Sequence, residues 1–187
     1  MHADELKPAP QPLQLVQQFL NTRSLMRNFD LLDTPLSFTT WCTETAGISL
    51  KRMPDEQDLE RYRSLREALR KLLLSHMSGS PAEKASASEE INRIMGPDLL
   101  QASFTQLAEP KVTARQDGDT SLEGRLMEAA VDAHYRKIWR RLKVCANEDC
   151  RWSFFDRSKN RSATWCDMAI CGSRTKMRLY RQRRNTR

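Results

Sequence analysis

The stretch CANEDCRWSFFDRSKNRSATWCDMAIC, Cys145–Cys171, decides how the C-terminal part of the chain folds. It holds four of the five cysteines, spaced C-x4-C-x15-C-x4-C. Two close pairs separated by a linker of this size are typical of a structural zinc site, in which two short loops each present two thiolates to one tetrahedral ion. We therefore predict one structural Zn²⁺ bound by Cys145, Cys150, Cys166 and Cys171.

Other uses of these cysteines are disfavoured. Two disulfides would need an oxidising compartment, to which nothing in the sequence points. An iron–sulfur cluster remains an alternative, but the spacing matches no common ferredoxin pattern. A catalytic zinc is disfavoured because four thiolates leave no coordination position for water. The fifth cysteine, Cys42, lies beside Trp41 and is interpreted as a core residue.

Four aromatic residues lie between or beside the predicted ligands: Trp152, Phe154, Phe155 and Trp165. A segment this short cannot build a large core, so the metal should organise it. A mini-core packed against the metal loops is favoured over a platform on which bases stack. Arg151–Phe155 is a candidate strand within this module.

A basic helix is predicted after the last cysteine, with Ser173 as its candidate N-cap. Arg174, Arg178 and Arg181 recur at spacings of four and three and form a stripe on it. Such a helix beside a duplex would neutralise phosphates, with affinity that falls with salt and gives little sequence choice. The alternative is a solvated helix without a specific role. The predicted nucleic-acid contacts are Arg157, Lys159, Arg161, Arg174, Lys176, Arg178, Arg181, Arg183 and Arg184.

The charge of the chain is divided unevenly. The formal net charge is +7, yet residues 136–187 hold 16 Lys and Arg against 4 Asp and Glu, whereas residues 1–135 hold 15 against 20. An acidic body with a basic end has an electrostatic reason to meet a polyanion with that end. A solubilising tail is the alternative that composition leaves open.

The upstream part indicates helices. Residues 13–20 fit either a helical face or a short strand. Thr34-Pro35 is a typical helix start, and Gly47 lies where a left-handed residue would end that helix. The clearest helix opens at Pro54-Asp55, with apolar residues at spacings of three and four up to His76. Ser78-Gly79-Ser80-Pro81 is expected to break it.

Three further elements are expected before the cysteines. Ser80 and Glu83 have capping-box spacing before a shorter helix that stops at Gly96. Residues 99–104 and 112–115 are a candidate hairpin. Thr120 and Glu123 again have capping-box spacing, before a long amphipathic helix that reaches Leu142.

The predicted fold is therefore mainly α. An N-terminal helical domain (residues 13–140) with a small β-hairpin precedes a four-cysteine zinc finger (residues 141–187) made of a short β-hairpin and a helix. No stretch approaches the roughly 18 to 20 apolar residues that span a bilayer, and residues 1–12 do not resemble a secretory signal. We expect a cytoplasmic protein without a membrane partner.

The stretch from Cys145 to Arg184 resembles the CGNR zinc finger family. The matching residues are Cys145, Cys150, Phe155–Asn160, Trp165–Met168, Cys171–Arg174 and Lys176–Arg181. One departure is plain: Ser173 stands where the family has the Asn of its name. Both residues can cap a helix, so the fold should survive, but a base or phosphate contact made by that Asn would be altered.

The upstream part resembles the ABATE domain, also called the stress-induced transcription regulator domain. The resemblance rests on Phe19–Thr22, on Leu31–Pro35 with Trp41 and Gly47, and on Leu65–Leu69. Together the two resemblances cover nearly the whole chain. They imply a bacterial transcription regulator that holds DNA with its zinc end and senses a small molecule with its front domain.

Three classes of function can be compared. A zinc-dependent DNA-binding regulator is favoured by the charge division, the cysteine spacing and the basic helix. An RNA- or protein-binding adaptor is the alternative, because zinc modules with basic helices also serve that role. An enzyme is not expected, since the three histidines are scattered and the sequence has no Gly-rich phosphate loop, Gly-x-Ser-x-Gly elbow or His-Glu-x-x-His motif.

Two further expectations concern partners. Asn21, Arg23 and Arg66 are candidates for a polar ligand pocket in the front domain, where an effector would bind. A homodimer is a second candidate, because regulators often dimerise to match two half-sites, although the sequence contains no heptad seam.

Overall fold

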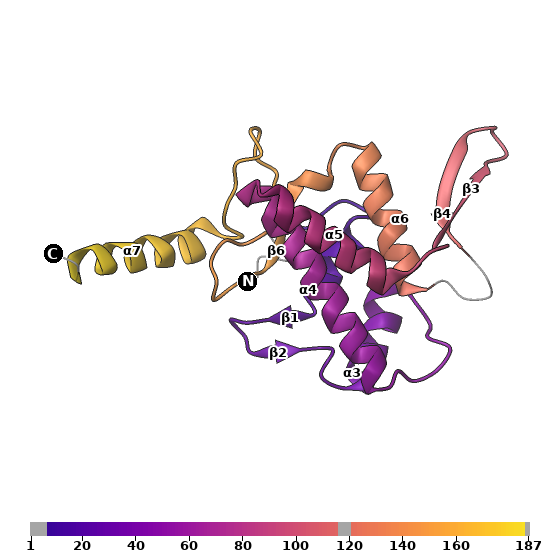
Figure 1. Cartoon of the computed structure of the whole chain (residues 1–187), viewed down its shortest axis with the longest axis horizontal. Coiled ribbons are helices and arrows are strands. Elements are labelled where there is room, and N and C mark those ends of the chain that lie inside the picture. Colours follow the sequence, from indigo (N-terminus) through magenta and orange to yellow (C-terminus); the bar gives the residue numbers. More distant parts are fainter. Residues whose placement is uncertain (1–6, 116–120, 186–187) are drawn as a thin grey trace.

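The computed structural model describes residues 7–115 and 121–185. The chain is about 52% helical, with a few short two-stranded sheets. A helical body is followed by the cysteine-rich module and a last helix, as predicted for a mainly α fold. Figure 1 shows the body in the centre, the hairpin β3–β4 projecting from one end and the last helix, α7, projecting from the other.

The ambiguous segment near the N-terminus is a helix, α2 (Gln14–Leu20). It packs against both α4 and α6, so it lies in the middle of the body. Val16, Phe19 and Leu20 are almost fully buried. A central position explains why this segment is apolar on more than one face and why periodicity alone could not distinguish helix from strand.

A small polar corner follows α2. Strands β1 (Arg23–Ser24) and β2 (Phe29–Asp30) pair antiparallel. Helix α3 (Pro35–Trp41) then begins where predicted, with the Thr34 side chain accepting the Ser37 N–H at 3.2 Å. It continues into one wider turn and ends at Gly47, whose φ of 65° is left-handed.

Helices α4 (Glu56–Ser78) and α5 (Pro81–Met95) form an antiparallel pair with extensive contact. Asp55 and Asp58 form a reciprocal capping box at the start of α4. The expected breaks are confirmed at Gly79 and Gly96, which have positive φ.

The candidate hairpin is confirmed as β3 (Leu100–Phe104) and β4 (Pro110–Ala114), paired antiparallel from Leu100↔Ala114 to Phe104↔Pro110. Helix α6 (Leu122–Tyr135) follows. Its N-cap is Ser121, whose side chain accepts the Gly124 N–H at 3.0 Å. Thr120, which we expected in a capping box, lies outside the described residues.

The prediction that α6 reaches Leu142 is wrong. The helix ends in a Schellman arrangement, in which Ile138 N–H donates to Ala133 and Lys137 N–H donates to His134, both at 2.9 Å. Lys137 holds the left-handed position, with φ of 58°. Glycine is the usual residue at this position. Because this chain has lysine there, the sequence gives no signal that the helix ends.

The chain then makes a short 3-10 turn, η2 (Trp139–Arg141), and enters a second hairpin. Strands β5 (Leu142–Val144) and β6 (Ser153–Phe155) pair antiparallel. The sequence predicts β6 inside Arg151–Phe155, but its partner β5 lies where the helix was expected. The turn η3 (Met168–Gly172) leads directly into α7 (Ser173–Asn185).

The core is divided in two. Apolar residues of α2, α3, α4 and α6 form a large cluster that extends to Leu142, Val144 and Phe155 of the second hairpin. A smaller cluster joins the four C-terminal cysteines to Trp152 and Phe154. Among the described helices, none combines the length and the apolar character that crossing a bilayer requires.

Candidate zinc centre and basic helix

The four predicted ligands converge. The Sγ atoms of Cys145, Cys150, Cys166 and Cys171 all lie within 4.8 Å of one another, and all four residues are buried. Cys166 Sγ lies 3.6 Å from both Cys150 Sγ and Cys171 Sγ. A tetrahedral zinc ion with Zn–S bonds of about 2.3 Å requires S···S separations of about 3.8 Å. No disulfide joins them, so the residues fit one structural zinc ion.

The first pair of ligands is set by a tight backbone turn. Cys145 follows β5 directly, and its N–H donates to Trp152 O at 2.8 Å. The N–H groups of Cys150 and Arg151 both donate to Asn147 O, at 2.9 and 3.0 Å. Asn147 is buried. The short hairpin therefore brings two cysteines five residues apart to one point.

The second pair is set by the turn before α7. Cys171 N–H donates to Asp167 O at 2.9 Å, and the Asp167 side chain accepts the Ile170 N–H at 2.8 Å. A Cβ on Gly172 would lie 2.5 Å from Met168 Sδ and 3.2 Å from Trp165 Cδ1. A larger residue beside the last ligand would therefore displace the Met168 side chain, which now lies over Gly172.

The expectation that Ser173 is the N-cap is wrong. Asp167 caps the turn six residues earlier, and Ser173 already has helical angles of φ −65° and ψ −43°. Its hydroxyl donates to Met168 O at 3.4 Å. The helical turn starts before the last cysteine because the Asp167 side chain already caps it, so Ser173 lies inside the helical segment.

The thiols influence one another strongly. Hydrogen bonds from Cys150 and Cys166 stabilise the thiolate of Cys145 and lower its pKa to about 2. The hydrogen bond to Cys145 raises the pKa of Cys150 to about 12, and the hydrogen bonds to Cys145 and Cys150 raise the pKa of Cys166. The negative charge of one thiolate thus makes it harder for the neighbouring thiols to lose their protons. A divalent cation removes that opposition, which is the electrostatic reason for such a cluster to bind one.

A buried ion pair supports the loop after β6. Lys143 Nζ donates to Asp156 Oδ2 at 2.7 Å and to the carbonyls of Arg161 and Ala163 at 2.6 and 3.0 Å. Burial alone would raise the pKa of Asp156, but hydrogen bonds from Lys143 and from Ser158 outweigh it and lower the pKa to about 2. The pair fixes the loop that carries three of the predicted basic contacts.

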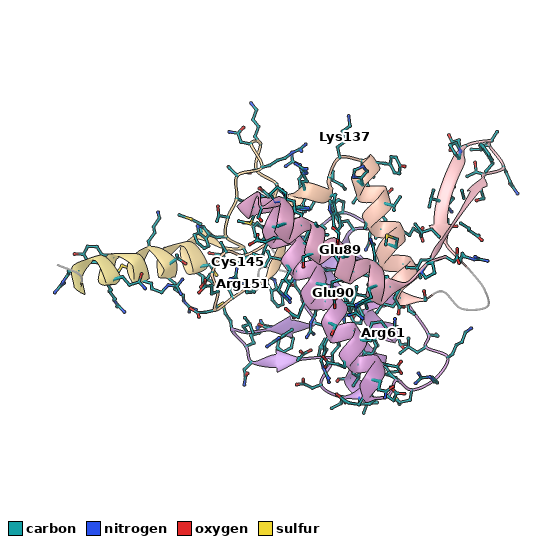
Figure 2. All side chains as sticks on the ribbon, viewed as in Figure 1. Arg61, Glu89, Glu90, Lys137, Cys145 and Arg151 are labelled. Atoms are coloured by element: carbon teal, nitrogen blue, oxygen red, sulfur yellow. The ribbon has the colours of Figure 1, made fainter. Side chains whose placement is uncertain are left out.

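The basic residues lie on two neighbouring features. Arg157, Lys159 and Arg161 are exposed on the loop after β6. On α7, the exposed side chains include Arg174, Lys176, Arg178, Arg181 and Arg184. The side chain of Arg183 lies outside the described residues. Figure 2 shows α7 leaving the body near the labelled Cys145 and Arg151, so the zinc centre lies at the base of the helix.

The predicted arginine stripe lines a shallow groove. Arg174, Arg178 and Arg181 contribute to its wall together with Ile170 and Met177. Arg178 also lies 3.6 Å from Asp149 in the first cysteine loop, where both side chains are exposed. An exposed ion pair of this kind contributes little free energy, so it does not keep Arg178 from another anion.

Comparison with known families gives two matches. A family model described as "Putative stress-induced transcription regulator", ABATE, matches residues 13–135, which is well over half of the chain. The chain belongs to the ABATE family. A second model, described as "CGNR zinc finger", matches residues 141–184 and so contains all four cysteines. No curated protein matches the chain.

Within the ABATE domain, the candidate pocket residues are engaged with other protein groups. Arg66 is about 1% exposed and donates to both oxygens of Asp30 at 2.6 Å and to Thr22 Oγ1 at 3.0 Å. Arg23 lies 3.7 Å from Glu67. Arg66 and Arg23 are thus brought to one corner, where the contacts made by Arg66 hold α4 against β2.

Asn21, the third candidate, instead contacts the CGNR zinc finger. Its side-chain Oδ1 accepts the Ser153 N–H, and its Nδ2 donates to Ser153 O. Gln17 also donates to Ser153 O, at 3.2 Å, and Arg70 donates to Leu20 O at 2.7 Å and to Arg151 O. Sequence reasoning missed Gln17 and Arg70 as contacts to the finger. The sequence offered little signal for Gln17, because α2 also carries Gln14 and Gln18 and only the structure shows that Gln17 is the buried one with a polar partner.

Proposed function

We propose that this ABATE-family chain is a zinc-dependent DNA-binding transcription regulator of the bacterial cytoplasm, and that it holds duplex DNA through the CGNR zinc finger and α7. The observation that carries the proposal is the position of α7. The helix contacts η3 but extends away from the body (Figure 1). It therefore presents its basic side chains without the acidic body around them.

The sequence of α7 supports a polyanionic partner. Its 13 residues include six Arg or Lys and no Asp or Glu. Arg174 and Arg178 are four residues apart, and Arg178 and Arg181 three, spacings at which like charges repel and weaken a helix. A helix of this length that packs against little else is also marginal in water. Phosphate groups along a duplex would relieve the repulsion and stabilise the helix.

The zinc ion has a structural part in this proposal. Cys171 lies in η3, the turn that leads directly into α7, so binding by four cysteines fixes where the helix leaves the body. Four thiolates complete the tetrahedral shell of zinc and leave no position for a substrate. This closed shell supports binding rather than catalysis as the role of the module.

Salt-dependent DNA binding tests the proposal. The triple variant Arg174→Gln, Arg178→Gln, Arg181→Gln should bind a random-sequence duplex at least about ten-fold more weakly, and the slope of log K against log salt should fall by about 3. A matched control, Arg27→Gln, Lys71→Gln, Lys111→Gln, removes the same charge from exposed positions of the ABATE domain. The control should bind as the parent does, and both should retain one zinc ion per chain. Equal binding by the two triples would contradict the proposal.

An adaptor function is the second candidate. Ile170, Met177 and Tyr180 are 43%, 52% and 59% exposed beside the arginine stripe, and exposed apolar side chains of this kind favour a protein or single-stranded RNA partner. Competition between duplex DNA and single-stranded RNA of equal length, at one salt concentration, separates the candidates. Preference for the duplex supports a DNA regulator, and preference for RNA overturns it.

A further inference from the structure

We propose that an apolar cavity between α5 and α6 of the ABATE domain is a binding site for a small molecule with a single aromatic ring. The cavity has a volume of about 170 Å³. It is separate from the polar corner formed by Arg66 and Asp30. This ligand site is additional to the proposed DNA-binding function, and binding of the ligand can be tested without DNA.

Helix packing explains why the cavity exists. Helix α5 packs along α4, while α6 packs against α2, so the two outer helices leave space between them. Val16 of α2 and Leu69 of α4 contribute to its lining from the buried side, and Ile91 and Leu126 from the two outer helices. The walls belong to well-packed elements, so the space is part of the fold.

The lining selects the chemistry of the ligand. Among the described residues that line the cavity, none is charged, and the polar ones are Ser88 and Asn92, one helical turn apart on α5. Asn92 is exposed and Ser88 is half-buried, so both lie at the mouth. A charged ligand would lose its hydration without a counterion. An apolar ring with at most one polar substituent, directed toward Ser88 and Asn92, suits this lining.

The size of the cavity favours one ring. An apolar cavity of on the order of 150 Å³ holds benzene. Met95 and Met127 are part of the lining, and the flexible thioether side chain of methionine adapts to irregular ligands. Trp139 offers an aromatic ring at one side of the cavity, which provides a favourable offset or edge contact for an aromatic ligand.

The position of Trp139 connects the cavity to the finger. Trp139 begins η2, β5 follows at Leu142, and the first zinc ligand, Cys145, comes directly after β5. A ligand that contacts Trp139 therefore touches the segment that enters the zinc module. Only an effect of the ligand on DNA binding would rest on the proposed function. Binding of the ligand to the cavity is measured without DNA, so the two proposals can be contradicted independently.

Fluorobenzene is a suitable probe, and ¹⁹F NMR of the zinc-loaded full chain measures its binding. We expect saturable binding. Ala130→Phe places a ring in the cavity from α6 and should weaken binding at least about ten-fold, as expected when the space is filled. Ala85→Phe makes the same change at an exposed position of α5 and should leave binding unchanged.

A second measurement keeps the test decisive if Ala130→Phe does not fold. The indole N–H resonance of Trp139, assigned with Trp139→Phe, should shift on addition of fluorobenzene to the parent protein. The resonance of Trp41, which lies in the core against Phe19 and Phe38, should stay in place. Absence of saturable binding, equal binding by a folded Ala130→Phe variant, or a stationary Trp139 resonance would overturn the proposal.

Discussion

The side-chain amide of Asn21 pairs with both backbone polar groups of Ser153, which lies 132 residues further along the chain. Oδ1 accepts the Ser153 N–H at 2.8 Å, and Nδ2 donates to the Ser153 carbonyl at 3.0 Å. Both residues are buried. The ABATE domain thus completes the hydrogen bonding of strand β6, and the zinc finger is attached to the body by a specific polar contact.

Removing this contact should destabilise the protein. Asn21→Ala leaves a buried backbone N–H without its acceptor, which costs about 1 to 3 kcal/mol in the free energy of unfolding. Urea unfolding measures this change. Asn160→Ala, at an exposed loop position, is the control and should change the free energy by less than about 0.5 kcal/mol. Equal effects of the two substitutions would refute the role assigned to Asn21.

The Arg66–Asp30 pair should make the ABATE domain sensitive to acid. Burial raises the pKa of Asp30, but hydrogen bonds from Arg66 and from the Leu32 N–H, together with the charge of Arg66, lower it overall. A carboxyl group with a lowered pKa stabilises the fold above its unfolded value of about 3.9. That stabilisation is lost as the pH falls through the lower folded value.

Asp30→Asn should therefore cost about 3 kcal/mol at pH 7, because it leaves the buried Arg66 without its main counterion. The difference from the parent should stay constant from pH 7 to 5 and narrow below about pH 4. Urea unfolding at each pH gives the difference, with the exposed Asp33→Asn as control. A difference that does not depend on pH down to 3 would show that Asp30 is not the titrating group.

Lys137 offers a stabilising substitution. Lys137, labelled in Figure 2, has a left-handed φ of 58° and lies where α6 ends. For a residue with a Cβ, this left-handed conformation costs about 1 to 2 kcal/mol of conformational free energy, whereas for glycine it does not. Part of the gain is lost because glycine is more flexible in the unfolded chain. Lys137→Gly should raise the free energy of unfolding by about 0.5 to 1 kcal/mol in thermal or urea unfolding, and a loss of stability would contradict the Schellman ending.

Thiol reactivity should distinguish the zinc ligands from Cys42. Burial raises the pKa of Cys42 to about 12, so its thiol should not react in the folded chain. A thiol reagent should modify no cysteine rapidly in the zinc-loaded protein. It should modify four cysteines after the zinc is removed by a chelator, and all five after denaturation. Rapid reaction of the zinc-loaded protein would count against metal binding by the four thiols.

The sequence predicted those parts of the structure that depend on local signals. The cysteine spacing predicted the ligand cluster, and Thr34, Gly47 and Gly79 marked helix ends correctly because caps and left-handed residues act within a few positions. The end of α6 could not be predicted from the sequence, because Lys137 occupies the left-handed position that glycine usually fills.

Contacts between residues that are distant in the sequence were the other part of the structure that could not be predicted. Asn21 and Ser153 are far apart in sequence, and nothing local indicates that the residue just after α2 hydrogen-bonds to the backbone of β6. The short β-hairpin predicted for the finger is confirmed, but the position of its first strand, β5, was not predicted, since the pairing depends on a partner nine or more residues away. Gln17, Asn21 and Arg70 need hydrogen-bond partners because they are buried, and only the fold shows that they are buried and which groups they contact.

The affinity for duplex DNA with and without zinc tests the central claim most directly. Fluorescence anisotropy of a labelled random-sequence duplex should give binding by the zinc-loaded chain, a loss of at least about ten-fold in affinity after chelation, and recovery when zinc is restored. If the chelated chain binds the duplex as tightly as the zinc-loaded chain, the four cysteines do not organise the DNA-binding surface and the account is contradicted.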